Sequence, residues 1–255
     1  MVKFLNFCDS HYGFERVNGK IYPIHDIKAI NAMLKFAKDF KPDVVIASGD
    51  IIDAGCVSHH NHGKPGQTEG LKLIDDVRGA HKVIIAPIEA LKPKQMIYIT
   101  GNHCAWLNQL TDIIPSLEGL LDLKTLLKLD KWKVIPQGGQ FDLGKLTFLH
   151  GDGLSGGEGV AKAAVTNYER SVRFGHHHTF AVHSKTSASE YKNGKTGICV
   201  PCLCKKNPAY SKAKPNKWLQ GFNWGFVEPN GSFTDYISTI IDGHFIGPNG
   251  KSYQG

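Results

Sequence analysis

Five short hydrophobic segments of this chain are each followed at once by aspartate, histidine or asparagine. The segments are expected to be β-strands, and they are Val2–Cys8, Asp43–Ser48, Met96–Thr100, the second arm of a hairpin at Gln140–Leu149, and Ser171–Phe174. The polar residues that follow them are Asp9 and His11, Asp50, Asn102 and His103, His150, and His176 and His178. In open α/β sheets the ligand crevice lies at the carboxyl ends of the strands. The pattern therefore predicts that the five strand ends converge on one site.

Helical patterns separate these strands. Apolar residues recur at helical spacing over 25–39, and 68–91 is expected to be mostly helical with an interruption near Pro87. Another helix is expected after an N-cap at Ser116, and 158–169 is expected to form one more. The buried face of the helix after Ser116 would consist of Leu117, Leu120, Leu121 and Leu127. Strands that alternate with helices indicate a layered α/β protein.

Composition narrows the class of protein. With 41% hydrophobic and 21% charged residues, the chain is not globally disordered. It lacks both a run of roughly 18–20 apolar residues and a signal peptide, so we expect a soluble, cytoplasmic protein with no membrane partner. The net charge of +7 favours polyanionic partners such as nucleic acid. The six cysteines do not form the pattern of a disulfide framework.

The residues at the strand ends are those of a metal site. Imidazole nitrogen combined with carboxylate or amide oxygen suits manganese, iron or zinc. Two such ions about 3.5–4 Å apart, sharing a carboxylate, can activate a water and hold both oxygens of an in-line phosphoryl displacement. The ligand types therefore predict a site with two metal ions, whose chemistry would suit phosphoryl transfer.

The order and spacing of the motifs resemble the calcineurin-like metallophosphoesterase family. The motifs are D-x-H at Asp9–His11, G-D at Gly49–Asp50, G-N-H at Gly101–His103, a lone His150, and G-H-x-H at Gly175–His178. Each is common by itself, but all five in order after predicted strands are specific, and they cover about residues 1–185. The resemblance implies an α/β sandwich of two mixed β-sheets flanked by helices, with the metal site at the strand C-terminal ends.

The resemblance also implies a role for each residue. Two divalent metal ions would be bound, with manganese expected first and iron, zinc, nickel or magnesium as alternatives. A metal-bridging hydroxide would attack phosphorus, and His103 would stand beside the phosphate as the catalytic side chain. The first metal would be held by Asp9, His11 and His178, and the second by Asn102, His150 and His176, with Asp50 bridging both.

One position departs from the family pattern. The residue after Gly-Asn-His is usually an acid that supports the histidine, and here it is Cys104. A neutral cysteine would not support an imidazolium, so we expect His103 to be a weak general acid and poor leaving groups to react slowly.

The segment after Asp50 bears on the substrate. Protein phosphatases of the family have an arginine in a GDxxDRG pattern, whereas the segment here is GDIIDAG, without that arginine. This favours a phosphodiesterase or SbcD-type nuclease acting on nucleic acid or a nucleotide, and a phage-encoded enzyme in a host cytoplasm is a looser resemblance. The alternatives are a phosphomonoesterase acting on a nucleotide or phosphoprotein, and a non-catalytic scaffold with the same fold.

Several features outside the motifs remain open between two interpretations. The loop with His59, His60 and His62 either contacts substrate or is simply solvated. Residues 192–218 contain seven lysines, among them Lys205 and Lys206, which either track a nucleic-acid backbone or form a solvated loop. Cys199, Cys202 and Cys204 either bind zinc or, as we favour, pack in a buried strand over Ile198–Leu203. His177 is expected to point away from the site.

We expect one metallophosphoesterase domain over residues 1–255. Within it, 53–70 would be an inserted loop rich in histidine and glycine, and 184–217 a polar, lysine-rich insertion. The tail at 218–255, with a turn at Glu228–Gly231, would add strands that complete the sandwich. No partner protein or oligomeric state can be inferred.

Overall fold

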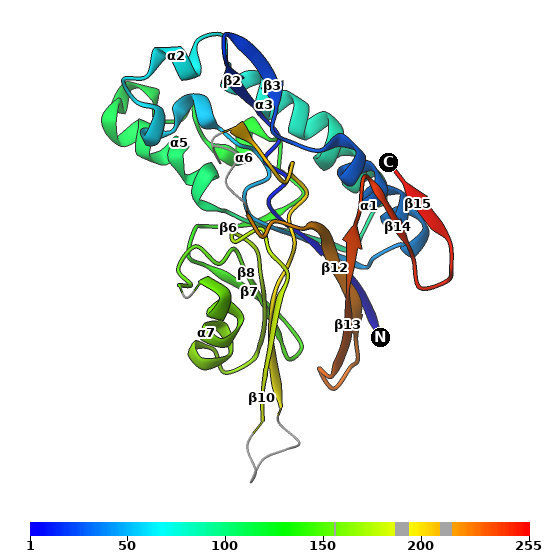
Figure 1. Cartoon of the computed structure of the whole chain (residues 1–255). Helices are drawn as coiled ribbons and strands as arrows, with labels where there is room; N and C mark the ends of the chain where they lie inside the picture. Colours follow the sequence, from blue (N-terminus) through cyan, green and yellow to red (C-terminus); the bar gives the residue numbers. More distant parts are fainter. Residues whose placement is uncertain (156, 187–193, 210–215) are drawn as a thin grey trace.

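The structure of the chain, a computed structural model, describes residues 1–155, 157–186, 194–209 and 216–255. Two mixed β-sheets lie face to face, with helices on their outer sides, as Figure 1 shows. The expected architecture of two mixed sheets flanked by helices is therefore confirmed. None of the helices in the described part of the chain has the length and hydropathy needed to cross a bilayer.

The larger sheet has six strands in the order β13-β12-β1-β4-β5-β6. The strands β1, β4, β5 and β6 are parallel neighbours, and β12 and β13 extend the sheet as an antiparallel hairpin. The turn predicted at 228–231 connects these last two strands. The strands are β1 (Val2–Phe7), β4 (Val44–Ser48), β5 (Gln95–Ile99), β6 (Lys133–Ile135), β12 (Gln220–Val227) and β13 (Phe233–Ile240).

The smaller sheet has five strands in the order β10-β11-β9-β8-β7. Its central strands β8, β9 and β11 are parallel, and β7 and β10 are antiparallel at the edges. These strands are β7 (Gln140–Leu143), β8 (Leu146–Leu149), β9 (Ser171–Phe174), β10 (Ala181–Lys185) and β11 (Lys195–Cys199). Two small hairpins complete the strand set, formed by β2 (Phe14–Val17) with β3 (Lys20–Pro23) and by β14 (His244–Ile246) with β15 (Ser252–Gln254).

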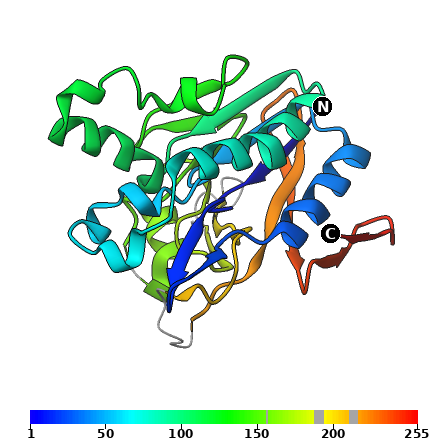
Figure 2. The ribbon, with the colours of Figure 1, turned by 90° about the horizontal axis from the view of Figure 1, so that it is seen from above.

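Alternation along the strands creates the layers. In β4, Val44 and Ile46 pack between the sheets against Phe148 of β8, whereas Val45 and Ala47 face the helices on the outer side. Figure 2 shows α1 (Ile27–Phe40) and the α3 (Leu73–Ala80) to α4 (Ala86–Ala90) helix beside the larger sheet. The helix α7 (Val160–Asn167) covers the smaller sheet through Val160 and Ala164. The main core thus lies on both sides of the larger sheet.

Three predicted helices form close to their expected places: α1, the α3 to α4 helix and α7. Asp26 accepts hydrogen bonds from the Lys28 and Ala29 backbone N–H groups and thereby caps α1. A π-helical turn at His81–Ile85 joins α3 to α4 immediately before Pro87, so the expected interruption is present. The remaining short helical elements are α2 (Pro65–Thr68), η1 (Gly55–Val57), η2 (His59–Asn61) and η5 (Gly157–Gly159).

The prediction of a helix after an N-cap at Ser116 is wrong. The chain instead forms α5 over Asn102–Ile113, then a short turn of η4 at Pro115–Leu117 and a single turn of α6 at Leu123–Leu126. Asp122, not Ser116, caps α6, and Leu120 is 66% exposed instead of buried. The strand expected over Ile198–Leu203 ends at Cys199, although residues 199–204 are all buried.

Candidate metal centre

The candidate ligands lie where the parallel strands of both sheets end. Asp9 and His11 follow β1, Asp50 follows β4, and Asn102 begins α5 after β5. In the other sheet, His150 follows β8 and its parallel neighbour β9 leads to the G-H-x-H motif. The carboxyl ends of parallel neighbours share one edge of a sheet, so each sheet brings its polar residues to the same edge.

The backbone at these positions is unusual. Five candidate ligands have a positive φ, a conformation that residues other than glycine seldom adopt and that clusters at functional sites. They are Asp9 (50°), His11 (42°), Asp50 (47°), His176 (67°) and His178 (55°). The strand ends therefore turn sharply, and these turns direct the side chains into the site.

Two motif glycines permit close approach of ligand side chains. A Cβ at Gly49 would lie 2.2 Å from Nδ1 of His150, and a Cβ at Gly101 would lie 2.2 Å from Oδ1 of Asp50. Any side chain at either position would displace a candidate ligand. The glycines of the G-D and G-N-H motifs are thus part of the geometry of the site.

The first ligand group consists of Asp9, His11 and His178, whose ligand atoms lie within 4.8 Å of one another. The Nε2 atoms of His11 and His178 are 3.1 Å apart, and Oδ1 of Asp9 lies 3.6 Å from Nε2 of His178. All three residues are buried. Oδ1 of Asp9 has no hydrogen-bond partner among the described residues, so a buried carboxylate oxygen faces two imidazole nitrogens. This donor set fits a divalent cation.

The second ligand group consists of Asp50, His150 and His176, again with ligand atoms within 4.8 Å. Nε2 of His150 lies 3.1 Å from Oδ2 of Asp50 and 3.0 Å from Oδ1 of Asn102. The structure thus brings together all seven residues expected to bind metal, in two neighbouring groups around one cavity. Asp50 joins the second group.

The charges of the two groups also suit a cation. Burial would raise the pKa of Asp9, but His178 lowers it well below its usual range, and His150 does the same for Asp50. Burial likewise lowers the pKa of His150, yet Asp50 and Asp9 raise it to about 10. Burial and the neighbouring His150 lower the pKa of His176 to about 4, so this imidazole is neutral and able to bind metal.

A residue that the sequence analysis did not single out, Asp53, supports His103. Nδ1 of His103 donates to the Asp53 carbonyl oxygen at 2.8 Å and lies 3.5 Å from Oδ1 of Asp53, which also accepts from Nδ1 of His11 at 3.0 Å. Burial lowers the pKa of His103, but Asp50 and Asp53 raise it to about 9. The signal in the sequence was a second aspartate three residues after Asp50.

Cys104 gives His103 no support, as expected, but another residue does. The Cys104 thiol points into the core, 3.2 Å from the Tyr98 hydroxyl, and the residue is 1% exposed. Asp53 supplies the carboxylate that the G-N-H motif lacks, and the Trp106 ring packs against the imidazole, tilted by 36° with 3.9 Å between centroids. His103 is thus held beside the cavity by a carboxylate and an aromatic ring.

The cavity over the ligand groups has a volume of about 390 Å³. His60 lines it together with Trp106 and Trp218, and His59 packs against His60. His62 lines a separate hollow, and of the described residues that line the main cavity none is Lys205 or Lys206. His177 belongs to neither ligand group, and its ring lies near Phe174 and His176.

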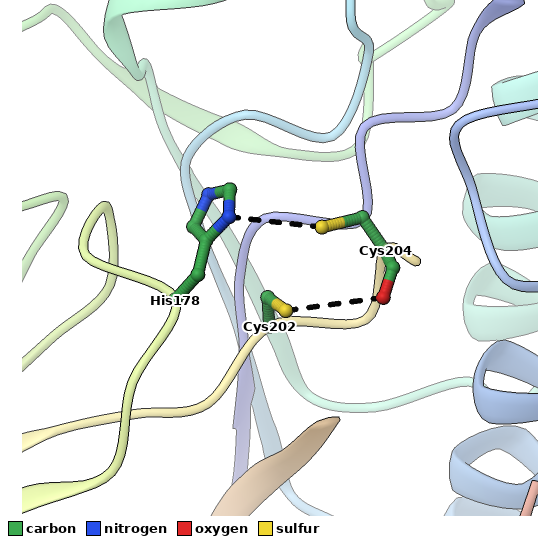
Figure 3. Close-up of side chains that lie close together, drawn as sticks. All are labelled: His178, Cys202 and Cys204. Atoms are coloured by element: carbon green, nitrogen blue, oxygen red, sulfur yellow. Dashed lines mark hydrogen bonds between the residues drawn. The ribbon is translucent and has the colours of Figure 1, made fainter. Parts of the chain in front are cut away.

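The cysteines form no single cluster. Cys202 and Cys204 lie with His178 in a further group of possible ligand atoms, drawn in Figure 3. Cys199 is separate, and its thiol donates to the Gly175 carbonyl oxygen at 3.8 Å. The three-cysteine zinc site that the sequence left open is therefore reduced to a pair beside one histidine.

No family model and no curated protein sequence matches the chain. Among solved structures, the chain is similar to Vps29 of Chaetomium thermophilum, with a TM-score of 0.46, 11% identity, and coverage of 100% of this chain and 96% of that one. It is also similar to a dimetal phosphatase of Danio rerio, with a TM-score of 0.45, 11% identity, and coverage of 89% of this chain and 93% of that one. For the E. coli phosphoesterase YfcE the TM-score is 0.41 and the identity 12%, with coverage of 92% of this chain and 98% of that one. Because all three TM-scores are below 0.5, the assignment of the site rests on its own geometry.

Proposed function

We propose that this protein is a metal-dependent phosphoesterase of the calcineurin-like metallophosphoesterase family, with two divalent ions, that hydrolyses phosphodiester bonds in nucleic acid or nucleotides. The observation that carries the proposal is the pair of buried ligand groups on one cavity, with His103 beside them. In this proposal residues 1–255 form one domain, in which 53–70 and 184–217 are insertions and 218–255 completes the sandwich.

The ligand groups define which residues would hold each ion. Asp9, His11 and His178 would bind the first ion, Asn102, His150 and His176 the second, and Asp50 would bridge them. Nitrogen and oxygen donors favour manganese, with iron, zinc, nickel and magnesium as alternatives. When bound, the two ions would supply an activated water and neutralise charge that develops on the phosphoryl group.

The protein's own contribution to the reaction is a positioned proton donor. In the metal-free protein, the buried Asp50 and Asp53 raise the pKa of His103 to about 9 and so favour its protonated form. Its backbone N–H donates to Oδ1 of Asp50 at 2.9 Å, and this contact fixes the ring at the edge of the cavity. From there His103 can donate its proton to the oxygen of the leaving group.

The surroundings of the cavity support a nucleotide unit as the bound group. Trp218 lines it and is partly exposed, and aromatic faces of this kind stack on bases. The volume of about 390 Å³ falls in the usual range for a small-molecule site. A nucleic-acid strand longer than this unit would have to leave the cavity along the protein surface. The nuclease assignment therefore depends on whether the lysine-rich segment binds its backbone.

The first experiment measures hydrolysis of bis-p-nitrophenyl phosphate, p-nitrophenyl phosphate, and single-stranded and duplex DNA by the protein loaded with Mn²⁺. We expect the diester to be cleaved faster than the monoester, and cleavage to stop after chelation. Faster cleavage of the monoester would indicate a phosphomonoesterase. Two bound metal ions without hydrolysis of any of these substrates would indicate a non-catalytic scaffold.

The second experiment asks whether the substrate is a polymer. The carbonyl oxygen of Lys206 accepts from Nδ2 of Asn216, and Oδ1 of Asn216 accepts from the Trp218 backbone N–H, so this lysine is tied to the cavity wall. If Lys205 and Lys206 bind phosphates, replacing both by Gln should make DNA affinity less sensitive to salt. The slope of the logarithm of the association constant against the logarithm of the salt concentration should become less negative by roughly 0.7–0.9 for each phosphate that is no longer neutralised. Hydrolysis of the small diester should not change.

The control for this experiment is the pair Lys133→Gln and Lys145→Gln, two exposed lysines elsewhere on the surface. DNA binding is measured by fluorescence anisotropy at three salt concentrations. An unchanged salt dependence in the Lys205/Lys206 variant would favour a nucleotide or another small diester as the substrate.

A further inference from the structure

We propose that Cys204 is a positioning residue for the metal centre: its buried thiol accepts a hydrogen bond from Nδ1 of His178 and so directs Nε2 of that imidazole toward the first ligand group. This inference rests on the proposed function, because it takes His178 as a metal ligand. Figure 3 shows Nδ1 of His178 turned toward Cys204, with 3.7 Å between nitrogen and sulfur. Cys204 is fully buried and His178 is 5% exposed, so water does not compete for this contact.

The other histidines of the site follow the same arrangement with oxygen as the partner. Nδ1 of His150 donates to the Ser48 carbonyl oxygen at 3.0 Å, and Nδ1 of His11 donates to Oδ1 of Asp53 at 3.0 Å. When Nδ1 carries the single proton of a neutral imidazole, the lone pair of Nε2 is the one that can bind a metal ion. For His178, the sulfur of Cys204 occupies the place of that oxygen.

The Cys204 segment is itself fixed to the site. The Leu203 backbone N–H donates to the carbonyl oxygen of Asp9 at 3.1 Å, and Nε2 of Gln220 donates to the carbonyl oxygen of Cys204 at 2.8 Å. On the other side, the Leu219 backbone N–H donates to the carbonyl oxygen of His178 at 2.8 Å. With both backbones held and Trp218 packed against the ring, 4.1 Å between centroids, the thiol is the polar partner of Nδ1.

A metal ion bound by the two cysteines is the competing arrangement. Cys202, Cys204 and His178 have ligand atoms within 4.8 Å, but no fourth His, Cys, Asp or Glu in the described ranges joins them, whereas a closed zinc site has four ligands. The Cys202 thiol already donates to the Leu219 carbonyl oxygen at 3.3 Å. The structure therefore favours the thiol as a hydrogen-bond partner.

The test compares Cys204→Ala with Cys202→Ala, which lies in the same buried segment but whose thiol faces a carbonyl group. Affinity for Co²⁺ is measured by competition with a chelating dye. Loss of a partner behind a metal-binding histidine costs about 10–100-fold in affinity, and we expect a loss in this range for Cys204→Ala. Cys202→Ala should bind like the wild type, and Cys204→Ser, whose hydroxyl can also accept, should recover part of the loss.

Further readouts separate the possible failures. Nitrogen-15 NMR of the metal-free protein should show the proton of His178 on Nδ1 in the wild type and a mixture of tautomers in Cys204→Ala and, to a smaller degree, Cys204→Ser. An unchanged Co²⁺ affinity and an unchanged His178 tautomer in both Cys204→Ala and Cys204→Ser would overturn the proposal. A cobalt–thiolate absorption band lost in both the Cys202 and Cys204 variants would also overturn it, because the pair would then bind metal directly. No binding of divalent ions by the wild type would instead refute the proposed function and this inference with it.

Discussion

The two ligand groups of the cavity are held in different ways. In the second group, His150 is fixed by the backbone carbonyl of Ser48, and Asp50 accepts from the backbone N–H of His103. In the first group, Asp9 also accepts from a backbone N–H, that of His176, but the imidazoles are fixed by side chains: His11 by Asp53 and His178 by the thiol of Cys204. Where the backbone holds the ligands, their orientation changes only if a ligand itself is substituted or a strand moves. A group held by side chains can be altered by substitutions that leave every ligand in place.

The largest effect is expected from a ligand of the second group. Asp50→Asn removes a charge from a buried carboxylate that faces His150 and would bridge the ions. Because a bound metal contributes several kcal/mol to transition-state stabilisation, we expect the rate to fall by on the order of 10³-fold or more, with loss of bound metal. Metal content is measured by atomic emission and the rate with the aryl diester. A variant with full metal content and full rate would remove Asp50 from the centre.

His103 lies between the two groups and should separate rate from metal binding. His103→Ala keeps the backbone N–H that donates to Asp50, so metal content should stay near the wild-type level. Loss of a general acid should lower the rate by about 10²–10⁴-fold. The same metal analysis and hydrolysis assay test both expectations. Metal loss as large as that of Asp50→Asn would make His103 a ligand instead.

Asp53 tests whether side-chain support in the first group matters for the reaction. Asp53→Asn removes the charge that His11 and His103 share, and we expect a rate loss of about 10–100-fold, the range found for partners behind active histidines. The loss should be greater for alkyl than for aryl diesters, because alkyl leaving groups need protonation. Hydrolysis rates of a series of diesters measure this difference.

The control is Cys104→Ser, a small change at a side chain that faces Tyr98. It should leave the ratio of alkyl to aryl rates unchanged. A change in that ratio with Cys104→Ser, and none with Asp53→Asn, would return the supporting role to position 104.

The strands and their polar ends could be predicted because each signal is local. A run such as Val44–Ser48 is buried on both faces, so it is hydrophobic throughout, and the next two residues must turn into the site. The helix α5 was missed because it begins inside the G-N-H motif, where Asn102 and His103 suggest a loop. The expected helix after Ser116 failed for the opposite reason: its leucines have a helical spacing, but Leu120 has no buried surface to pack on.

The contacts that support the ligands could not be predicted, since they join residues far apart in the chain. Cys204 meets His178 only because β11 returns beside β9 and the chain then passes Asp9. Asp53 meets both His11 and His103 because the chain after β4 crosses the ends of β1 and β5. Spacing in the sequence identified the ligands, whereas the residues that orient them depend on the tertiary fold.

The smallest expected effect concerns a carboxyl group behind Asp53. Burial, together with the charge of Asp53, raises the pKa of Asp76 to about 8, and Oδ2 of Asp76 accepts from the Ala54 backbone N–H at 3.2 Å. In the unfolded chain this carboxyl has a pKa near 3.9. Between about pH 4 and pH 8 the folded protein therefore retains a proton that the unfolded chain releases, and the free energy of unfolding falls as pH rises. The slope from this group is at most about 1.4 kcal/mol per pH unit.

Asp76→Asn removes this contribution while its amide oxygen can still accept from Ala54. The variant should therefore gain stability relative to the wild type as pH rises from 4 to 8, as measured by urea denaturation at several pH values. Asp75→Asn, at the exposed neighbouring position, should show no such trend. If the two variants gave parallel pH profiles, Asp76 would be ionised in the folded protein. The first ligand group would then have a second negative charge behind Asp53. That charge would also stabilise the imidazolium of His103, so the pKa of His103 would rise further.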